Sequence, residues 1–283
     1  MVDGDGCLCD EHAPLLFGDD LGVLHGDGVF ETVLVREGRA RLVDAHLARL
    51  VDGAARLDLP EPDVQALRRA VVVAQDGWVQ EGWATPRDGA LRIVYTRGRE
   101  SEPDTPTAFV TVSPVPERVA AARRDGVSVT LLPRGQDPDV TAPWELSGAK
   151  ALSYARNTAA LRHARGNGFD DAIYLSSTGS VLESPRANVV AVLDGGLTAT
   201  PPGDGILAGT TQAALFDVAS RHGIAVRYRR MTPADLVRAD GAWLLSSLTL
   251  AARVRRIDDR VLHEPPNRAV DVPKLVIEAI AAR

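Results

Sequence analysis

One lysine stands out in this sequence because lysine is almost absent from it. The 283 residues include 32 lysines and arginines, and only Lys150 and Lys274 are lysines. A lysine amine can lose its proton and attack a carbonyl carbon, whereas the guanidinium of arginine stays charged at physiological pH. Lys150 lies among small residues in Ser147–Tyr154, which we place at the start of a helix. The alternative interpretation, a plain surface charge, suits Lys274 and stays open for Lys150.

Two other segments carry groups that bind anions. A glycine-rich loop ends in Gly209-Thr210-Thr211 and leads into a predicted helix, whose free N–H groups and positive dipole end suit a phosphate. Hydroxyl groups in Ser246–Thr249 follow an apolar strand, where they also can bind phosphate oxygens. Each pattern has an ordinary alternative, a helix N-cap at Thr210 or Thr211 and a simple turn after the strand. No Gly-Lys-Ser/Thr follows the glycines, which excludes a P-loop for nucleoside triphosphates.

A carboxylate completes the set of candidate groups. Glu183 ends a short predicted strand, where a carboxylate is usually solvated or paired with arginine. Opposite a pyridine nitrogen, it would instead hold that nitrogen protonated and make the ring an electron sink. A nucleophilic lysine, a phosphate site and a carboxylate are together what pyridoxal 5′-phosphate requires. No one of the three is specific by itself, but their joint occurrence is.

Composition limits the class of protein. The net charge of −6 argues against a general nucleic-acid or acidic-membrane surface, and no apolar run has membrane-spanning length. The acidic stretch Met1–Leu16 lacks the basic start and apolar core of a signal peptide, so we expect a cytoplasmic protein. Cys7 and Cys9 suit neither an unstrained disulfide nor a zinc site, and the six histidines are scattered. We therefore expect no metal.

Strands and helices alternate in two blocks, which predicts an α+β (mixed α/β) enzyme with two domains. We expect a small N-terminal α/β domain over residues 1–115, a polar connector over 116–126 and a larger C-terminal domain over 127–283. A strand at 29–35 should turn into a second at 40–43, and a helix should follow with Asp44 as its N-cap. The other expected elements are helices at 62–81, 152–165 and 211–222, and strands at 90–96, 107–113, 127–132, 171–176, 188–193, 197–200, 225–229 and 242–246.

Over nearly its whole length the chain resembles the fold-type IV pyridoxal phosphate enzymes, the class IV aminotransferase family. The motifs that carry the resemblance, in family order and spacing, are Gly26–Thr32, Asp44–Leu50, Lys150 with Asn157, Gly179–Glu183 with Asn188, Thr200-Pro201 and Ile206–Thr211. The resemblance implies a D-amino-acid-aminotransferase-like fold, with a small and a larger domain and the active site between them. It also implies a homodimer whose partner closes the site around a small-molecule substrate.

The resemblance assigns roles to individual residues. Lys150 would be the catalytic lysine, covalently attached to pyridoxal 5′-phosphate, and Glu183 would contact the pyridine nitrogen. Tyr154 is a candidate donor to the ring hydroxyl, or else a core tyrosine. The expected phosphate ligands are Arg49, Leu207, Thr210, Thr211 and Thr249. Without the motif, Arg49 would read as a solvated arginine on a helix surface.

The family contains branched-chain aminotransferases, D-amino-acid aminotransferases and 4-amino-4-deoxychorismate lyases. The Arg-Asn-His run with which the D-amino-acid enzymes bind the substrate carboxylate is missing, because Arg99-Glu100-Ser101 follows Thr96–Gly98. The segments His25–Thr32, Ala149–Tyr154 and Leu244–Arg253 look most like the aminodeoxychorismate lyase branch. We therefore expect a lyase that gives pyruvate and 4-aminobenzoate, a folate precursor.

Two alternatives remain beside the lyase. The first is an aminotransferase of branched-chain or D-amino acids, in which Lys150 moves a proton to the cofactor. The second, more distant, is a non-catalytic binding protein on the same fold. The candidates for substrate contact are Arg97, Thr32, His25, Arg186 and Arg253. The arginines among them can equally be surface charges, and His25 can equally be packed under the first strand.

Overall fold

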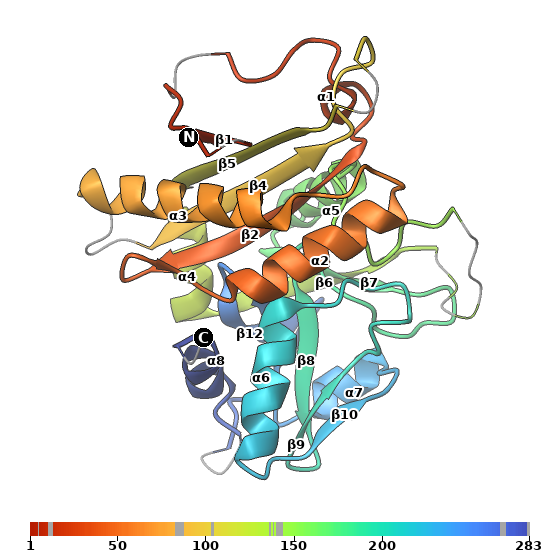
Figure 1. The fold of residues 1–283 in the computed structure, drawn as a ribbon. Helices are drawn as coiled ribbons and strands as arrows, with labels where there is room; N and C mark the ends of the chain where they lie inside the picture. Colours follow the sequence, from red (N-terminus) through yellow and green to blue (C-terminus); the bar gives the residue numbers. More distant parts are fainter. Residues whose placement is uncertain are drawn as a thin grey trace. The chain divides into compact units, whose positions relative to one another are not determined.

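The computed structural model describes residues 1–4, 6–10, 14–82, 88–102, 105–135, 137, 139, 144–266 and 270–281. The chain divides into two compact units (Figure 1). Unit 1 comprises Met1–Pro116 together with Ala149–Tyr154, and unit 2 comprises Glu117–Gly148 together with Ala155–Arg283. The segment that holds Lys150 thus belongs to unit 1, although the chain on either side of it belongs to unit 2.

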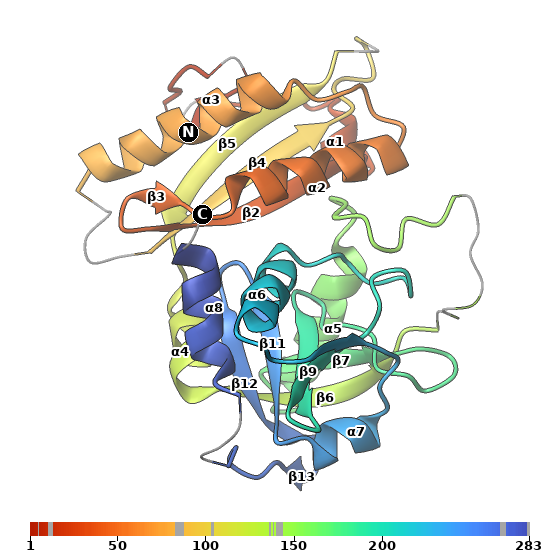
Figure 2. The same ribbon diagram turned by 60° about the horizontal axis from the view of Figure 1, so that its bottom comes forward.

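Unit 1 is built on an antiparallel sheet with the strand order β1-β5-β4-β2-β3. Its strands are β1 (Val2–Asp3), β2 (Gly28–Arg36), β3 (Arg39–Ala40), β4 (Gly89–Thr96) and β5 (Thr107–Pro114). The short helix α1 spans Leu21–Leu24, and the two long helices α2 (Val43–Arg56) and α3 (Val64–Gln80) cover one face of the sheet (Figures 1 and 2). Leu47, Leu50 and Ala54 follow one another at helical spacing on α2 and are buried in the core of this unit.

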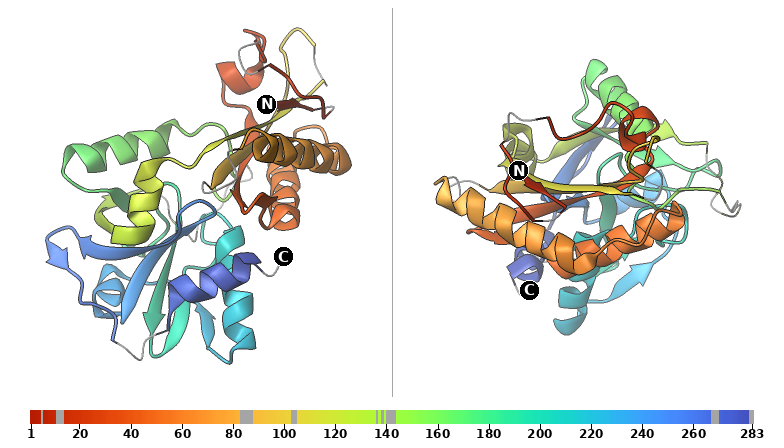
Figure 3. Two further views of the ribbon diagram at one scale, coloured as in Figure 1. Left: turned by 90° about the vertical axis from the view of Figure 1, so that its left-hand side faces the viewer. Right: turned by 45° about the horizontal axis from the view of Figure 1, so that its top comes forward.

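Unit 2 contains an eight-stranded mixed sheet with the order β10-β9-β8-β11-β12-β6-β7, and β13 pairs with β12. Its strands are β6 (Val127–Pro133), β7 (Asp171–Leu175), β8 (Asn188–Leu193), β9 (Gly196–Ala199), β10 (Val226–Tyr228), β11 (Gly241–Ser246), β12 (Leu250–Ile257) and β13 (Arg260–Val261). Its helices are α4 (Glu117–Asp125), α5 (Ala155–Gly166), α6 (Thr210–Arg221), α7 (Pro233–Arg238) and α8 (Val272–Ala281). Helices α6 and α8 pack against each other, as the left view of Figure 3 shows.

No helix in the part of the chain that the structure describes combines the length and the apolar character needed to span a lipid bilayer.

Within the expected connector at 116–126, Glu117–Asp125 form the helix α4, whose residue Val119 is buried. Two expectations about local structure are wrong. Asp44 is not the N-cap of α2. The N-cap is Leu42, which has the left-handed conformation with φ 56° and forms no side-chain cap hydrogen bond. Asp44 lies in the first turn, where its negative charge interacts favourably with the helix dipole. Lys150 does not lie at a helix start, since α5 begins only at Ala155.

Candidate active site

Lys150 is fixed by a short extended segment that pairs with β2. The Phe30 N–H donates to the Lys150 carbonyl (3.0 Å), and the Leu152 N–H donates to the Gly28 carbonyl (2.8 Å). Ala151 forms a β-bridge with Val29. These contacts hold the Lys150 backbone on the sheet of unit 1, so its half-buried side chain leaves from a defined position.

The Phe30 ring brings two predicted site residues together. The Lys150 Nζ lies 4.5 Å from the centre of this ring, a distance at which the aromatic face attracts an ammonium group. Tyr154 meets the same ring edge-on, with the ring centres 5.6 Å apart and an interplanar angle of 87°. Lys150 and Tyr154 therefore share one aromatic neighbour on β2.

Arg49 belongs to a buried group of three side chains. The Arg49 Nε and Nη2 donate to the two carboxylate oxygens of Glu31, each at 2.7 Å, and the His46 Nδ1 lies 2.6 Å from Glu31 Oε2. The side chains of Glu31, His46 and Arg49 are 0%, 1% and 13% exposed. Glu31 points into the core from β2, while His46 and Arg49 lie one turn apart on α2. Arg49 is thus not the solvated helix arginine that the sequence alone allows.

The charges in this group follow from its burial and its partners. Burial alone would raise the pKa of the Glu31 carboxyl, but the Arg49 charge and the hydrogen bonds from His46 and Arg49 outweigh it and lower that pKa to about 2. Burial lowers the pKa of His46, and the charges of Arg49 and Lys150 add to this effect against the opposing influence of Glu31. At neutral pH, Glu31 is therefore ionised and His46 is neutral, so it donates to the carboxylate through its Nδ1–H.

In unit 2, Glu183 is bound at both carboxylate oxygens. The Arg134 Nη1 donates to Oε1 and the backbone N–H of Leu207 donates to Oε2, each at 3.0 Å. The Leu207 carbonyl in turn accepts a hydrogen bond of 2.8 Å from Asn188 Nδ2. Leu207 was expected among the phosphate ligands, but its N–H orients the acid instead.

The start of α6 has the properties of an anion site. Its N-cap is Gly209, which has no side chain, so the alternative in which Thr210 or Thr211 is the N-cap is wrong. Both threonines are buried, and the Thr211 hydroxyl has no hydrogen-bond partner among the described residues. An orphaned buried hydroxyl beside the uncapped N–H groups of a helix start offers donors to a phosphate. The residues therefore fit the phosphate end of a pyridoxal cofactor.

Thr249 lies at the same end of the sheet of unit 2 as the start of α6. It is in the turn between β11 and β12, and its N–H donates to Ser246 Oγ (3.1 Å). At the end of β11, Leu245 pairs with Asn188, the residue that binds Leu207 two positions before the α6 N-cap. Arg123 Nε donates to the Leu248 carbonyl (2.7 Å) and holds this turn in place.

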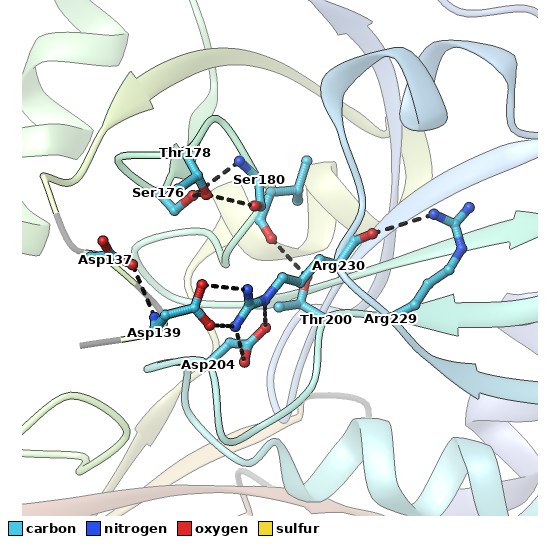
Figure 4. Close-up of polar contacts among 10 residues, drawn as sticks. Asp137, Asp139, Ser176, Thr178, Ser180, Thr200, Asp204, Arg229 and Arg230 are labelled. Atoms are coloured by element: carbon cyan, nitrogen blue, oxygen red, sulfur yellow. Dashed lines mark hydrogen bonds and ion pairs between the residues drawn. The ribbon is translucent and has the colours of Figure 1, made fainter. Parts of the chain in front are cut away.

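A second ion-pair network holds the loop that precedes α6 (Figure 4). Arg230 binds both carboxylate oxygens of Asp204, at 2.7 and 3.2 Å, and both of Asp139, at 2.6 and 3.0 Å. Asp204 lies three residues before Leu207, so Arg230 restrains the loop that brings the Leu207 N–H to Glu183. The hydrogen bonds to Asp139 and Asp204 raise the pKa of Arg230, which keeps this arginine charged.

Three of the five substrate candidates, Arg97, His25 and Thr32, lie in unit 1. Arg97 binds Asp27 through Nε (2.5 Å) and donates to the carbonyls of Leu57 (2.8 Å) and Asp58 (3.0 Å). Leu57 is the C-cap of α2 and Asp58 follows it, so Arg97 binds the chain directly after that helix. His25 is exposed, and the alternative that packs it under the first strand is wrong. Thr32, the third candidate of this unit, is half-buried on β2.

The other two substrate candidates belong to unit 2. Arg186 forms an ion pair with Asp171 at 3.2 Å. Arg253 pairs with Glu264 and lines a cavity of about 580 Å³ that includes Trp243. None of the expected cofactor ligands lines that cavity, whose described walls come from α4, β11, β12, residues 264–266, 270 and 271, and the start of α8. Glu183 is not among the residues that line this cavity.

Three neighbours of the candidate site escaped the sequence reasoning. Glu31 and His46 lie inside the motifs Gly26–Thr32 and Asp44–Leu50, where only Thr32 and Arg49 received a role. The three-residue spacing of His46 and Arg49 on a helix was a signal that they share one face. Arg134 had no comparable signal beyond its place directly after a predicted strand.

Comparison with known proteins decides the family. Residues 28–257 match the family model described as amino-transferase class IV. The chain belongs to the class IV aminotransferase family. It is 51% identical over 275 residues to the bifunctional aminodeoxychorismate lyase / D-amino acid transaminase of Mycobacterium tuberculosis, with 94% of each chain covered.

Solved structures agree with this assignment. A hypothetical aminotransferase from Mycobacterium tuberculosis in a PLP-bound form has a TM-score of 0.95 at 50% identity, with 99% of this chain and 98% of that chain covered. The fold IV-transaminase CpuTA1 from Curtobacterium pusillum has a TM-score of 0.89 at 39% identity, with coverage of 98% and 91%. The expected fold type IV is confirmed, and the cofactor of this class IV aminotransferase family member is pyridoxal 5′-phosphate.

Proposed function

We propose that this protein is a 4-amino-4-deoxychorismate lyase, which releases pyruvate and leaves 4-aminobenzoate. The observation that carries the proposal is the 51% identity, over 94% of both chains, to an enzyme named as a bifunctional aminodeoxychorismate lyase and D-amino acid transaminase. An aminodeoxychorismate lyase of Vibrio harveyi is also similar, at 24% identity over 94% of this chain. The wider family supports an enzyme that is a lyase or an aminotransferase, and the lyase activity is the finer assignment that we add.

The cofactor, when bound, supplies a ring that withdraws electrons from the substrate carbon next to the amino group. Lys150 would hold the cofactor covalently, and its amine would accept the proton from that carbon of the substrate. Glu183 would hold the ring nitrogen protonated, and Tyr154 would donate to the ring hydroxyl. The residues proposed to bind the phosphate are Arg49, Thr210, Thr211 and Thr249.

The reaction needs no second reactant. The substrate loses a proton from the ring carbon that bears its amino group, and the bond between the ring and the enolpyruvyl oxygen breaks. The departing enolpyruvate takes up a proton and becomes pyruvate, while the six-membered ring becomes aromatic. Aromatisation makes the step strongly downhill, so the main task of Lys150 is to move one proton between defined atoms.

A second candidate activity is that of a D-amino acid transaminase. It is favoured by the bifunctional name of the relative from Mycobacterium tuberculosis, and by a solved relative described as bound to alpha-ketoglutarate and PMP, 50% identical to this chain. In this activity Lys150 would carry the proton from the amino acid to the cofactor. The missing Arg-Asn-His run after Gly98 counts against it, because another residue must then bind the substrate carboxylate.

The chain offers a matched control for the test, since Lys274 is its only other lysine. Purified protein loaded with the cofactor would be reduced with borohydride, and mass spectrometry would locate the modified lysine. We expect the label on Lys150 in the wild type and in Lys274→Ala, and no label in Lys150→Ala. A label confined to Lys274 would refute the role of Lys150.

Three parallel assays then separate the activities. Aminodeoxychorismate should give equal amounts of 4-aminobenzoate, read by fluorescence, and pyruvate. D-alanine with alpha-ketoglutarate tests the second candidate, and a branched-chain amino acid with the same acceptor tests the remaining branch of the family. Transamination without any 4-aminobenzoate would replace the lyase proposal by the second candidate. A protein that binds the cofactor and gives no product in any assay would be a non-catalytic member.

We also propose a homodimer. Unit 1 exposes Phe17, Val23 and Leu24, which are 61%, 57% and 48% exposed and lie on or next to α1. Large apolar side chains gathered on one short segment are typical of a surface that another chain covers. Sedimentation velocity should give about twice the chain mass of 30.2 kDa, and Phe17→Ser with Leu24→Ser should shift the protein towards monomer.

A further inference from the structure

The Arg134–Glu183 ion pair carries an inference about how the acid in unit 2 works. Arg134 Nη1 donates to Glu183 Oε1 at 3.0 Å, and the two side chains are only 14% and 15% exposed. A carboxylate that is largely removed from water needs such partners to remain ionised. The second oxygen is bound by the backbone N–H of Leu207, also at 3.0 Å.

Backbone hydrogen bonds place Arg134 and Glu183 on opposite edges of β7, at Leu175 and Tyr174. The Arg134 N–H donates to the Leu175 carbonyl (2.8 Å), which continues the pairing of β6 with β7. On the other side of β7, the Tyr174 N–H donates to the Glu183 carbonyl (2.8 Å), and the Leu182 N–H donates to the Tyr174 carbonyl (2.9 Å). Arg134 and Glu183 thus flank the same strand, and their side chains meet over it.

The guanidinium of Arg134 is held from two further sides. Its central carbon lies 5.5 Å from the centre of the Tyr174 ring, and its Nη1 also donates to the Gly205 carbonyl at 3.2 Å. Gly205 is two residues before Leu207, in the loop that Arg230 restrains through Asp204. The loop that contains Gly205 and Leu207 therefore binds Arg134 and also supplies the backbone N–H that donates to Glu183.

We propose that Arg134 is a positioning residue that keeps Glu183 ionised, so that the proton shared with the cofactor stays on the pyridine nitrogen. This inference rests on the proposed function, in which Glu183 contacts that nitrogen. A proton on the carboxylate would lie next to the Arg134 cation, whereas a proton on the group that Glu183 binds lies farther from it. Coulomb repulsion therefore disfavours transfer of the proton from the ring to the acid.

The charge of Arg134 should therefore affect how strongly the cofactor ring withdraws electrons. A ring nitrogen that keeps its proton withdraws electrons more strongly than one that only accepts a hydrogen bond from a neutral acid. A neutral side chain at position 134 removes the repulsion and leaves the half-buried acid with one donor fewer. Glu183 should then take up a proton at higher pH, and the ring nitrogen should lose part of its positive charge.

The first readout is the ring nitrogen itself. The holoenzyme would be prepared with pyridoxal 5′-phosphate labelled with ¹⁵N in the ring, whose NMR shift reports protonation. We expect the protonated shift in the wild type and a shift towards the unprotonated value in Arg134→Gln, equivalent to about a tenfold change in the protonation ratio. Arg134→Lys, which keeps the charge, should lie between the two. Arg238→Gln, which removes an arginine paired with Asp235 on α7, is the matched control and should match the wild type.

The second readout needs no cofactor. The apoprotein, labelled with ¹³C at the glutamate carboxyl carbons, would be titrated, and the Glu183 signal would be identified by its loss in Glu183→Gln. We expect Glu183 to titrate at higher pH in Arg134→Gln than in the wild type or in Arg238→Gln. Urea unfolding of each apoprotein checks that the variants are folded.

The outcomes separate the two proposals. An unchanged ring-nitrogen shift in Arg134→Gln, or an equal shift in Arg238→Gln, overturns the role of Arg134. If Arg134→Gln moves the Glu183 titration but Glu183→Gln leaves the ring nitrogen unchanged, Glu183 is not the acid at the ring and the proposed function of that residue fails. In that case the effect of Arg134 on the titration of Glu183 remains supported, without a role at the ring nitrogen.

Discussion

Glu31 and Arg49 are joined by two hydrogen bonds of 2.7 Å inside unit 1, where the Glu31 side chain is completely buried. The pair lies between β2 and α2, and His46 donates to the same carboxylate from one turn earlier on the helix. An arginine side chain that is held in place in this way would lose little conformational freedom on binding the cofactor phosphate, the role proposed for Arg49. The same pair makes the stability of unit 1 sensitive to acid.

The first prediction concerns pH. The pKa of Glu31 is lowered from 4.5 to about 2, so its contribution to stability is complete above pH 4.5 and is lost as the pH falls towards 2. We expect this residue to cost about 2 kcal/mol of unfolding free energy by pH 3. The pKa of His46 is also lowered, mainly by burial, so a further loss should begin below about pH 6.5. Urea unfolding at several pH values measures both.

Glu31→Gln provides the control for this prediction. The variant should be less stable at pH 7 by about 3 kcal/mol, because Arg49 keeps a buried charge without its partner. Its stability should change less than that of the wild type between pH 5 and pH 3. Parallel pH curves for the two proteins would show that Glu31 is not the acid-sensitive group.

The second prediction separates binding from stability at the start of α6. The buried Thr211 hydroxyl has no hydrogen-bond partner among the described residues. Thr211→Val should leave the apoprotein as stable as the wild type, or stabilise it by about 1 kcal/mol, and should raise the cofactor Kd about tenfold. Thr198→Val is a matched control, because its hydroxyl on β9 is also buried without a partner in the described part of the chain. An equal change of Kd in both variants would contradict the phosphate role of Thr211.

The third prediction concerns the contact between Gly209 and Asn188. A Cβ at position 209 would lie 1.9 Å from Asn188 Oδ1, the side chain that also holds the Leu207 carbonyl. Gly209→Ala must displace Asn188 and should lower the unfolding free energy by about 1–3 kcal/mol. Gly203→Ala, with nothing within 4 Å of the added carbon, should be close to neutral. Differential scanning calorimetry of both apoproteins tests this, and equal melting temperatures would refute it.

The fourth prediction places Arg97 in the structure rather than in substrate binding. Its guanidinium binds Asp27 and the carbonyls of Leu57 and Asp58, directly after the C-terminus of α2, where a positive charge interacts favourably with the helix dipole. Arg97→Gln should lower the unfolding free energy by about 1–3 kcal/mol and leave the KM for substrate within about twofold. Arg69→Gln, an exposed arginine on α3, serves as control. A large rise in KM without loss of stability would contradict this prediction and would indicate that Arg97 binds the substrate.

The sequence predicted the elements that are determined by residues close together in the chain. The alternation of residues 90–96 predicts the strand observed as β4, Gly89–Thr96, and Asp194-Gly195 predicts the β8–β9 hairpin, in which both residues have positive φ. Helix α4 was missed because prolines precede it and its residues are mostly polar, so only Val119 is buried. The α2 start was missed because Leu42 adopts a conformation that sequence propensities disfavour.

In the candidate site too, some residues were predicted from the sequence and others were not. Lys150 and Arg49 were found from composition and motif. The partner of Arg49 on β2 and the partner of Glu183 at position 134 were not, because these pairs join residues 18 and 49 positions apart. Such contacts depend on strand order and on which face of a strand a side chain leaves. Neither is encoded in the spacing of nearby residues.

The return of Ala149–Tyr154 to unit 1 has a consequence for how the chain matures on the ribosome. Phe30 and Gly28 of β2 form hydrogen bonds with Lys150 and Leu152 of this segment. These bonds can form only after more than a hundred further residues have been translated. The N-terminal part of the nascent protein therefore cannot complete its folding in the order of synthesis. Lys150 is among the last residues to join unit 1, so this unit receives its lysine only after more than half of the 283 residues have been translated.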